Sequence, residues 1–408
     1  MIHLGRHVAH HGDCISVMRE RIADQSVDAV LCDPPYGLGF MGKAWDALPP
    51  GLEWAREVFR VLKPGAHVVA FGGTRTVHRL TCALEDAGFE IRDAIHYNYA
   101  SGFPKSLDVS KALDRAAGAE REVVGTRITG AISPNGRGDG CAVPTYGSGH
   151  TVIPITAPAT EAAKRWAGYG TALKPAIEPA ILARAPFSGT VADCVEKWGT
   201  AALNIDGCRF AYGDPCWPFG DDFETARAKN PGRVDLVTSA VYGAGRPQQR
   251  IDTAGRWPAN IYHCPKPSIA EREAGCAGLV QRGAGELTDR TDGSAGLDSP
   301  RAGAGRTSNG RGNHHPTVKP LRLFRWLARL VGGQPGSVIL DPFGGSGTTL
   351  LACEFEGFNC ITIEREAEYM PIIAARFTHG MRILRRLQSG ESVNAEAAQQ
   401  LARQGELF

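Results

Sequence analysis

The sequence predicts a doubly wound α/β fold, in which helices cover both faces of a parallel sheet. Two observations support this prediction. Short apolar runs alternate with segments of helical spacing from about residue 27 to 99, and the alternation resumes from about residue 321 to 387. Strands and helices that alternate at this spacing are typical of a doubly wound sheet. The two stretches are therefore expected to supply two pieces of one sheet.

The two stretches contain the same kinds of element. The first predicts, in chain order, a strand at Val27–Cys32, a helix at Leu52–Leu62, a strand at Ala66–Phe71, a helix at Thr76–Ala87 and a strand over residues 91–100. Lys63-Pro64-Gly65 is expected to end the first helix and Gly88 the second, because proline and glycine interrupt helices. The second stretch predicts a helix at Leu321–Val331, a strand at Ser337–Leu340, a helix at Gly347–Glu356, a strand at Asn359–Ile363 and a helix at Ala367–Leu387.

The segment between the two stretches has a different composition. Residues from about 118 to 312 are dominated by Gly, Arg, Pro, Ser and Asp, so we expect long loops there. Residues 172–186 (ALKPAIEPAILARAP) are an apolar island that could supply another core strand. Residues 198–210 and 255–263 are expected to be ordered parts of a variable module.

The overall composition limits the classes of function. The chain has 45 basic and 43 acidic residues, so any affinity for a polyanion must come from local clusters of charge. It has no run of about 18 apolar residues and no secretory signal at its start, which predicts a soluble, cytoplasmic protein without a membrane partner. The 11 cysteines form no C-x-x-C pair, so we expect reduced thiols and no metal site.

Asp33-Pro34-Pro35-Tyr36 follows a predicted buried strand and suits one particular chemistry. The exocyclic amino group of a nucleobase is a poor nucleophile because its lone pair is delocalised into the ring. An Asp33 carboxylate and a Pro34 carbonyl that accept its two hydrogens would aim the nitrogen at a methyl donor, and Tyr36 offers a ring for stacking. The prolines would hold these acceptors rigidly. Alternatively, the four residues form only a tight turn.

A glycine-rich segment follows the predicted strand at Ser337–Leu340. Its sequence, DPFGGSGTT from Asp341 to Thr349, allows a ligand to approach the backbone, and the next helix offers free N–H groups to an anion. The glycine spacing fits neither a dinucleotide nor a nucleoside triphosphate loop. The methionine part of S-adenosylmethionine fits better, and Glu364 could accept hydrogen bonds from its ribose. Alternatively, Glu364 is an ordinary acid in the first turn of a helix.

These motifs together resemble the amino-methyltransferases of the β class. DPPY comes near the amino terminus, and HPTVKP followed by DPFGGSGTT comes near the carboxyl terminus, which is the order of that class. More narrowly, GFPKSLDVSKALD, LKPAIEPAILARAP, WGTAALNIDGCRFA, RWPANIYH and NHHPTVKPLRLFRWLARLV resemble site-specific DNA methyltransferases of prophages and mobile elements. The resemblance covers most of the chain except residues from about 118 to 160 and 280 to 310.

The resemblance implies a Rossmann-like methyltransferase sheet with a circularly permuted order and an irregular inserted target-recognition region. It divides the chain into a catalytic half with DPPY (1–117), a flexible insertion (118–164), a core strand segment (165–190), a target-recognition region (191–312), a cofactor-binding half of the same domain (313–388) and a polar tail (389–408).

The resemblance also assigns site residues position by position. It makes Asp33, Pro34, Pro35 and Tyr36 catalytic. It implies that S-adenosylmethionine is bound by Asp13, Asp33, Thr317, Lys319, Asp341, Phe343, Gly344, Gly345, Ser346, Gly347, Thr348 and Glu364, with Asp13 near the adenine. From the residues alone, Asp13 could instead be the N-cap of a helix over ISVMRE, and Lys319 a solvated surface charge.

The implied activity is methylation of adenine N6 in double-stranded DNA, on a base turned out of the duplex. Adenine is favoured because Asp opens the motif, whereas relatives acting on cytosine N4 more often have Ser there. Cytosine N4, RNA, a protein glutamine and a catalytically silent DNA-binding relative remain alternatives, and a homodimer is considered. DNA contacts are expected from the arginines of the middle section, with Trp217 and Trp257 as wedges or platforms. These arginines are Arg209, Arg233, Arg246, Arg250, Arg256, Arg282, Arg290, Arg301, Arg306 and Arg311.

Overall fold

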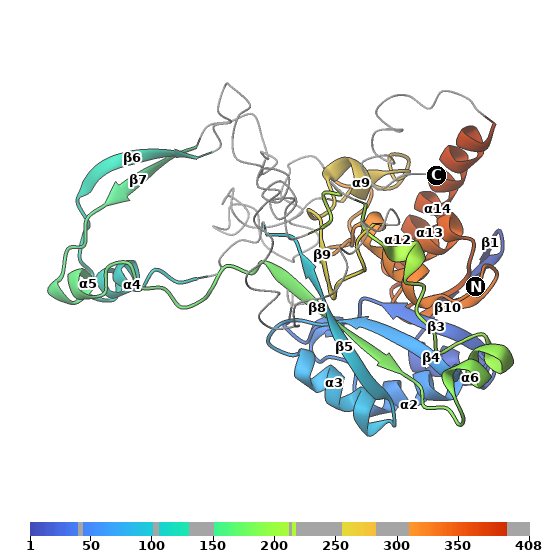
Figure 1. Cartoon of the computed structure of the whole chain (residues 1–408). Coiled ribbons are helices and arrows are strands. Elements are labelled where there is room, and N and C mark those ends of the chain that lie inside the picture. The colour runs from blue at the N-terminus through green and yellow to red at the C-terminus, as the bar shows by residue number, and fades with distance from the viewer. Residues whose placement is uncertain are drawn as a thin grey trace, which may run out of the picture. The chain divides into compact units, whose positions relative to one another are not determined.

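The protein is described by a computed structural model covering residues 1–39, 44–100, 106–129, 151–211, 214–217, 255–282 and 310–389. Its chain divides into two compact units (Figure 1). Residues 1–98 and 177 onward form the first unit, and residues 99–176 form the second. Within the described residues, no helix combines the length and the apolar character needed to span a bilayer.

The first unit is built on a sheet of nine strands among the described residues. They are β1 (Ile2–Leu4), β2 (His7–His11), β3 (Val27–Cys32), β4 (Leu62–Phe71), β5 (Glu90–Asn98), β8 (Ile177–Arg184), β9 (Ile261–His263), β10 (Val338–Asp341) and β11 (Asn359–Glu364). Their order is β1-β2-β11-β10-β3-β4-β8-β5-β9. The carboxyl-terminal strands β10 and β11 therefore lie between β2 and β3, which confirms the permuted order expected from the resemblance.

The direction of the strands corrects one expectation. Strands β2, β11, β10, β3 and β4 are parallel, but β8 is antiparallel to both of its neighbours, β4 and β5. The sheet is mixed and not parallel throughout. A parallel neighbour requires a crossover over one face of the sheet. The chain between β5 and β8 instead forms the second unit and returns beside β5 in the opposite direction.

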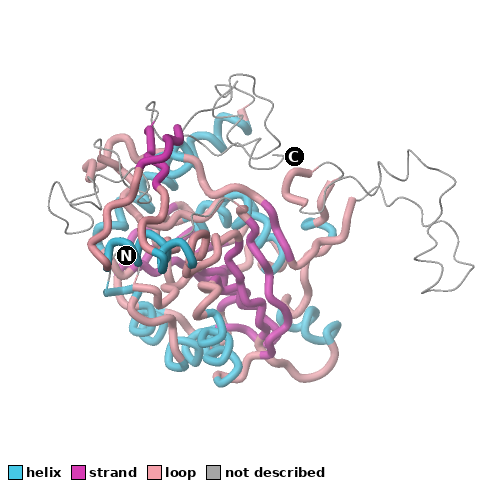
Figure 2. Tube along the Cα trace, turned by 90° about the vertical axis from the view of Figure 1, so that its left-hand side faces the viewer, coloured by secondary structure: helices cyan, strands magenta, loops and turns pink. Residues whose placement is uncertain are grey.

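Helices cover both faces of this sheet, as the doubly wound prediction requires (Figures 1 and 2). One face carries α1 (Cys14–Arg21), α2 (Leu52–Val61) and α3 (Val77–Asp86), and the other carries α12 (Leu321–Val331), α13 (Thr348–Glu356) and α14 (Met370–Gln388). The remaining helices in the described part of this unit are η2 (Ala44–Asp46), α6 (Val191–Trp198), η3 (Asp206–Cys208), α9 (Ile269–Glu273) and η4 (Ala367–Tyr369).

One cluster of the hydrophobic core lies between the sheet and α1, α2 and α3. All six residues of β3 are buried, and Trp54, Val58 and Val61 of α2 pack into the same cluster. Ile363 at the end of β11 belongs to this cluster as well. Burial of each large apolar side chain contributes about 1.5–3 kcal/mol to the stability of the fold, so this cluster holds in place the strand ends that carry the motifs.

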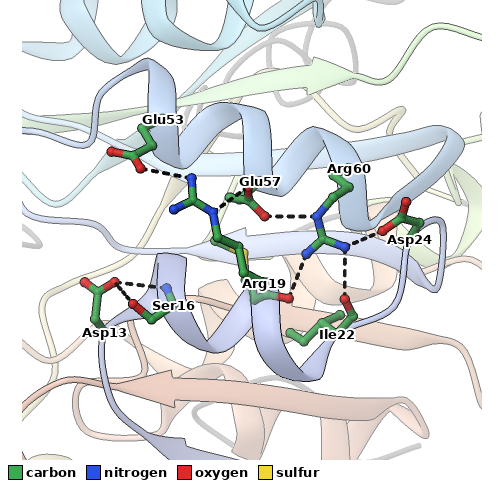
Figure 3. Close-up of polar contacts among 9 residues, drawn as sticks. Asp13, Ser16, Arg19, Ile22, Asp24, Glu53, Glu57 and Arg60 are labelled. Carbon is green, nitrogen blue, oxygen red and sulfur yellow. Dashed lines mark hydrogen bonds and ion pairs between the residues drawn. The ribbon is translucent and has the colours of Figure 1, made fainter.

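Charged side chains join α1 to α2 across the surface of this core (Figure 3). Arg19 of α1 donates to Glu53 and Glu57 of α2, at 2.9 Å in each case. Arg60 of α2 also donates to Glu57, at 2.9 Å, and pairs with Asp24 beyond the end of α1. Single exposed pairs contribute little, but a network of this kind fixes the position of α1 on α2.

The positions of most predicted elements are confirmed. The strand at Val27–Cys32 and the helix at Leu321–Val331 have the predicted bounds, and the apolar island supplies β8. The largest boundary error is at β4, which begins at Leu62, so that Lys63-Pro64-Gly65 lies inside the strand. The predicted last helix is divided into η4 and α14.

The second unit corrects the expectation of long loops from residue 118. It contains α4 (Val109–Ala116), β6 (Val123–Thr129), β7 (Thr151–Thr156) and α5 (Glu161–Arg165), and β6 pairs with β7 in antiparallel fashion. The buried Asp114 carboxylate holds the helices together by accepting hydrogen bonds from the backbone and hydroxyl of Thr160 and by pairing with Arg121. The β-branched residues of β6 and β7 favour strands, although the sequence around them is polar.

Candidate active site

The predicted site segments meet at one edge of the sheet. Strands β3 and β10 are parallel neighbours, so Asp33, directly after β3, and Asp341, at the end of β10, reach the same carboxyl edge. Glu364 ends β11 on the other side of β10, and Asp13 follows β2 beside it. Segments about three hundred residues apart in the chain therefore adjoin. Ligands of doubly wound sheets bind at this edge.

The turn at Asp33-Pro34-Pro35-Tyr36 is held from two sides. The Tyr36 hydroxyl donates to Asp33 Oδ1 at 2.9 Å, and the backbone N–H groups of Tyr36 and Gly37 donate to the buried Asp46 carboxylate at 2.6 and 3.0 Å. The Thr76 hydroxyl donates to the Tyr36 carbonyl at 2.6 Å. The prolines are therefore not the whole reason for a rigid turn. The sequence analysis missed Asp46, whose carboxylate fixes the turn by accepting the backbone N–H groups of Tyr36 and Gly37.

Lys319 lies inside the site and is not a solvated surface charge. Its side chain is 8% exposed, and its Nζ atom is 2.5 Å from Asp33 Oδ2 and 3.0 Å from the Tyr36 hydroxyl oxygen. Burial by itself favours the neutral amine, but the neighbouring Asp33 and Glu178 carboxylates raise the pKa of Lys319 above its usual value. The ammonium is therefore charged and paired within the site.

Glu178 is a site residue that the sequence analysis missed. It lies near the start of β8, and because β8 is antiparallel to β4, that start lies at the carboxyl edge beside Asp33. Glu178 Oε2 is 3.3 Å from Lys319 Nζ, and its Oε1 accepts from Lys266 at 2.8 Å. Burial would raise the pKa of Glu178, but the two lysines hold it at about 2. The one feature of the sequence that could have indicated Glu178 is its position as an acidic residue at the start of an apolar strand.

The glycine-rich segment forms a tight loop between β10 and α13. Asp341 Oδ1 accepts from the Phe343 N–H at 3.0 Å, and its Oδ2 accepts from the Thr349 hydroxyl at 2.5 Å. A Cβ atom at Gly344 would lie 2.4 Å from Thr362 Oγ1, and Gly347 has a left-handed φ of +77°. No larger residue fits these positions without a shift of the loop.

Two buried carboxylates line this loop. Glu364 accepts the N–H of Gly345 at 2.6 Å and that of Glu366 at 2.7 Å. It ends β11, so it is not an acid in the first turn of a helix. Burial raises the pKa of Glu364 to about 7 and that of Asp341 to about 7. Both groups are therefore strong acceptors for the hydroxyl or ammonium hydrogens of a ligand.

Two residues that were not predicted pack against the same loop. Arg376 of α14 is buried, and its Nη1 donates to the carbonyl and hydroxyl of Ser346 at 2.6 and 2.8 Å and to the Thr348 hydroxyl at 3.2 Å. His315 Nε2 is 2.9 Å from where a Cβ of Gly345 would lie. Its Nδ1 is 2.5 Å from the Thr317 carbonyl, so Thr317 reaches the loop through His315 while its own side chain is exposed.

Asp13 is the N-cap of α1, as one of the two interpretations predicted (Figure 3). Its Oδ1 accepts the Ser16 N–H at 3.0 Å. The preceding Gly12 N–H donates to the Glu364 carbonyl at 2.9 Å, so the exposed Asp13 lies next to the acid that ends β11. A further role beside a ligand remains a prediction.

The described part of the middle section contains aromatic and basic side chains. Arg209 lies 5.2 Å from the ring of Trp257, which is 62% exposed, and Arg256 lies 5.2 Å from the ring of Trp217. Arg282 pairs with Glu368, and Arg311 forms a β-bridge with Arg282. The other predicted arginines lie outside the described residues. They are Arg233, Arg246, Arg250, Arg290, Arg301 and Arg306.

Cys208 and Cys216 of this section are buried. Within the described ranges, no group of three or more His, Cys, Asp or Glu side chains is placed to hold a metal ion.

Comparison with known proteins gives a consistent set of matches. The model of a family described as DNA methylase (N6_N4_Mtase) matches residues 27–115 and 237–375, more than half of the chain. An Escherichia coli K12 protein described as a methylase, YubD, is 38% identical over 86 residues, which are 20% of this chain and 37% of YubD. The Type II methyltransferase M2.MboI of Moraxella bovis is 39% identical over 80 residues, 19% of this chain and 27% of that protein. The chain thus spans about a third of the length of these curated relatives.

Among solved structures, a complex named M1.HpyAVI-SAM is similar with a TM-score of 0.41 and 16% sequence identity. The alignment covers 90% of this chain and 98% of that one.

Proposed function

The chain belongs to the DNA methylase family, and on this premise we propose that it transfers a methyl group from S-adenosylmethionine to an exocyclic amino nitrogen of a DNA base. One observation supports the proposal above all others. The Asp33–Tyr36 turn and the Gly344–Gly347 loop follow adjacent parallel strands and open on the same edge of the sheet. A base and a methyl donor bound to these two motifs would therefore lie side by side.

The residues of the loop fit S-adenosylmethionine. Gly345 and Gly347 have left-handed φ values of +52° and +77°, and His315 and Ile373 crowd the positions of their Cβ atoms, so glycine is the residue that allows this tight loop before α13. Arg376 places a positive charge against the loop, which suits the carboxylate of the methionine part. Glu364, an acceptor with a raised pKa, suits the ribose hydroxyls. We assign the methionine end to Asp341, Phe343, Gly344, Gly345, Ser346, Gly347 and Thr348.

The remaining cofactor assignments rest on position alone. Asp13 would face the adenine end of the ligand, since it adjoins Glu364. Thr317 would act through His315, which packs on Gly345. For Lys319 we propose a place on the base side of the site, because its ammonium is paired with Asp33.

The reaction needs an amino nitrogen with an available lone pair. We propose that Asp33 accepts one amino hydrogen and the Pro34 carbonyl the other, so that the lone pair leaves the ring system, while the Tyr36 ring stacks on the base. The bound cofactor supplies a methyl group whose bond to sulfur breaks, with the electron pair left on sulfur, as the bond to nitrogen forms. The alkylated nitrogen is cationic and acidic, so its proton leaves easily to Asp33 or to water.

No covalent intermediate with the enzyme is required for this chemistry. The chain contains a Pro215-Cys216 dipeptide, but Cys216 is buried and burial raises the pKa of its thiol to about 11. A thiol in that state is a poor nucleophile for methylation at a ring carbon. Positioning of the base amino group next to the methyl group supplies the rate.

We further propose adenine N6 as the acceptor, because an Asp opens the motif. Cytosine N4 is the second candidate, since it carries the same kind of amino group and the family name covers both atoms. Double-stranded DNA would be bound through residues 191–312, where exposed Trp257 lies under the guanidinium of Arg209. A homodimer and a cytoplasmic location belong to the same proposal.

Expression in a host without DNA methylation tests the proposal directly. Long-read sequencing of the host genome should find methylated adenine in one short motif, or methylated cytosine N4 if the second candidate is correct. The same host with Asp33→Ala should show no mark. An unmodified genome together with purified protein that binds S-adenosylmethionine would indicate a silent relative and contradict the proposal.

A further inference from the structure

Four charged groups and one hydroxyl form a cluster on the base side of the site. The Lys319 ammonium lies 2.5 Å from Asp33 Oδ2, 3.0 Å from the Tyr36 oxygen and 3.3 Å from Glu178 Oε2. An ammonium has three hydrogens, so these three acceptors satisfy it. Lys266 lies 2.8 Å from the other oxygen of Glu178. The cluster thus pairs two carboxylates with two ammonium groups.

This arrangement conflicts with methyl transfer in one respect. Asp33 already accepts hydrogen bonds from Lys319 and from Tyr36, although it is the group proposed to accept the amino hydrogen of the base. The amino nitrogen becomes cationic as the methyl group is transferred, and an ammonium held against the same carboxylate opposes that charge. Asp33 would act best when Lys319 no longer neutralises it.

A buried ammonium cannot simply be released, because an unpaired charge in a protein interior is very unfavourable. Lys319 is 8% exposed and also lies 4.9 Å from the ring of Phe71. Glu178 is the second carboxylate within reach of the same Nζ atom, and its own side chain is 15% exposed. A small movement of the ammonium toward Glu178 would keep the charge paired while it frees Asp33.

We propose that Glu178 is a positioning residue that takes the Lys319 ammonium from Asp33 when a base amino group binds there. The inference rests on the proposed function and adds a residue to it. Glu178 acts through Lys319 and does not touch the reacting atoms. Lys266 competes with Lys319 for the Glu178 carboxylate and so limits how strongly Glu178 attracts the buried ammonium.

The test uses the full chain and an oligonucleotide carrying the motif that genome mapping identifies. Variants Glu178→Gln, Lys319→Met and the double variant are compared with wild type for kcat, for KM of the DNA and for S-adenosylmethionine affinity by calorimetry. Glu90→Gln is the matched control, because Glu90 pairs with Arg184 at the opposite end of β8, at 2.6 Å, away from the site.

We expect Glu178→Gln to lower kcat about tenfold or more while cofactor affinity and the KM for DNA change less than about threefold, whereas Glu90→Gln behaves as wild type. The double variant should be faster than Glu178→Gln, because it has no ammonium to move. A wild-type kcat in Glu178→Gln would overturn the proposal. So would a double variant whose kcat falls by the product of the factors measured for the two single variants.

A fifth variant guards against a loss of folding in Glu178→Gln. Lys266→Met changes a half-exposed side chain and removes the lysine that competes with Lys319 for Glu178, so kcat should be kept or raised. A tenfold fall in kcat with normal cofactor binding would indicate that Glu178 is only a structural anchor. If wild type itself methylates no DNA, the proposed function fails, and this inference fails with it.

Discussion

Two pairs of acidic side chains lie at the same edge of the sheet in opposite electrostatic states. On the base side, Asp33 and Glu178 are paired with lysines, and the pKa of Glu178 is about 2. On the cofactor side, the charges that act on Asp341 and Glu364 among the described residues come from other carboxylates, and burial raises both pKa values to about 7. The protein's own cations neutralise the base side, whereas on our proposal the hydrogens of a bound ligand would complete the cofactor side.

The largest effect should come from the base side. Asp33→Asn keeps the shape of the side chain and leaves Lys319 paired with Glu178, but it removes the charged acceptor for the amino group. We expect kcat to fall by about 10²–10³-fold, as for other preorganised groups at a reacting atom. Calorimetry should find the affinity for S-adenosylmethionine within about threefold of wild type. Loss of cofactor binding in this variant would show that the two sides are not separable.

The matching change on the cofactor side should affect binding instead. Glu364→Gln presents an amide to two backbone N–H groups and weakens the acceptor for the ribose. We expect cofactor affinity to fall about 10- to 100-fold, with kcat at saturating cofactor within about threefold. Glu366→Gln is the control, since among the described residues the Glu366 side chain pairs with Arg365 at 3.9 Å and with no other group. Equal losses of affinity in both variants would refute the assignment of Glu364.

The two sides should also differ in their response to pH. Asp341 and Glu364 have pKa values raised above those of an unfolded chain, so their charged forms destabilise the fold at high pH. Stability of the ligand-free protein should rise by about 1–2 kcal/mol as the pH falls from 8 to 6.5. Denaturant unfolding measures this rise, and Glu364→Gln should reduce it. A flat profile in wild type would contradict the raised pKa values.

Other groups set the limits of that pH window. Burial lowers the pKa of His67 to about 4 and that of His315 to about 3, so below about pH 6.5 the unfolded chain gains protons that these side chains do not accept in the fold. The rise in stability should then level off, because the histidines and the two carboxyl groups act in opposite directions. The lowered pKa of Glu178 has no effect in this range, because its contribution is lost only as the pH falls through about 4.5 toward 2.

The contrast between the two sides also explains what the sequence could predict. Asp33, Asp341 and Glu364 each follow a buried apolar run, and in a doubly wound sheet the residues after such runs share one edge. The alternation of strands and helices was enough to place them. Which strands are neighbours followed from the resemblance, and β10 between β11 and β3 confirms it.

The residues that sequence analysis missed depend on tertiary pairing. Glu178 reaches Asp33 only because β8 runs antiparallel to β4 and begins at the carboxyl edge. In a parallel sheet the same residue would lie at the opposite edge. Arg376 lies in the middle of a long amphipathic helix, where an arginine usually faces solvent, and only the packing of α14 on the loop buries it. No local pattern distinguishes these side chains from surface charges.

The smallest predicted effect concerns Asp13, at the margin of the cofactor side. Two substitutions there distinguish its role as a helix cap from a role in cofactor binding. Asp13 caps α1, so Asp13→Ala should lower the free energy of unfolding by about 0.5–2 kcal/mol in denaturant titration. Asparagine caps helices about as well as aspartate, so Asp13→Asn should unfold like wild type. If Asp13 also contacts the adenine, cofactor affinity should fall in both variants. An Asp13→Asn protein with wild-type affinity would leave the cap as its role and confine the cofactor side to Glu364 and the glycine loop.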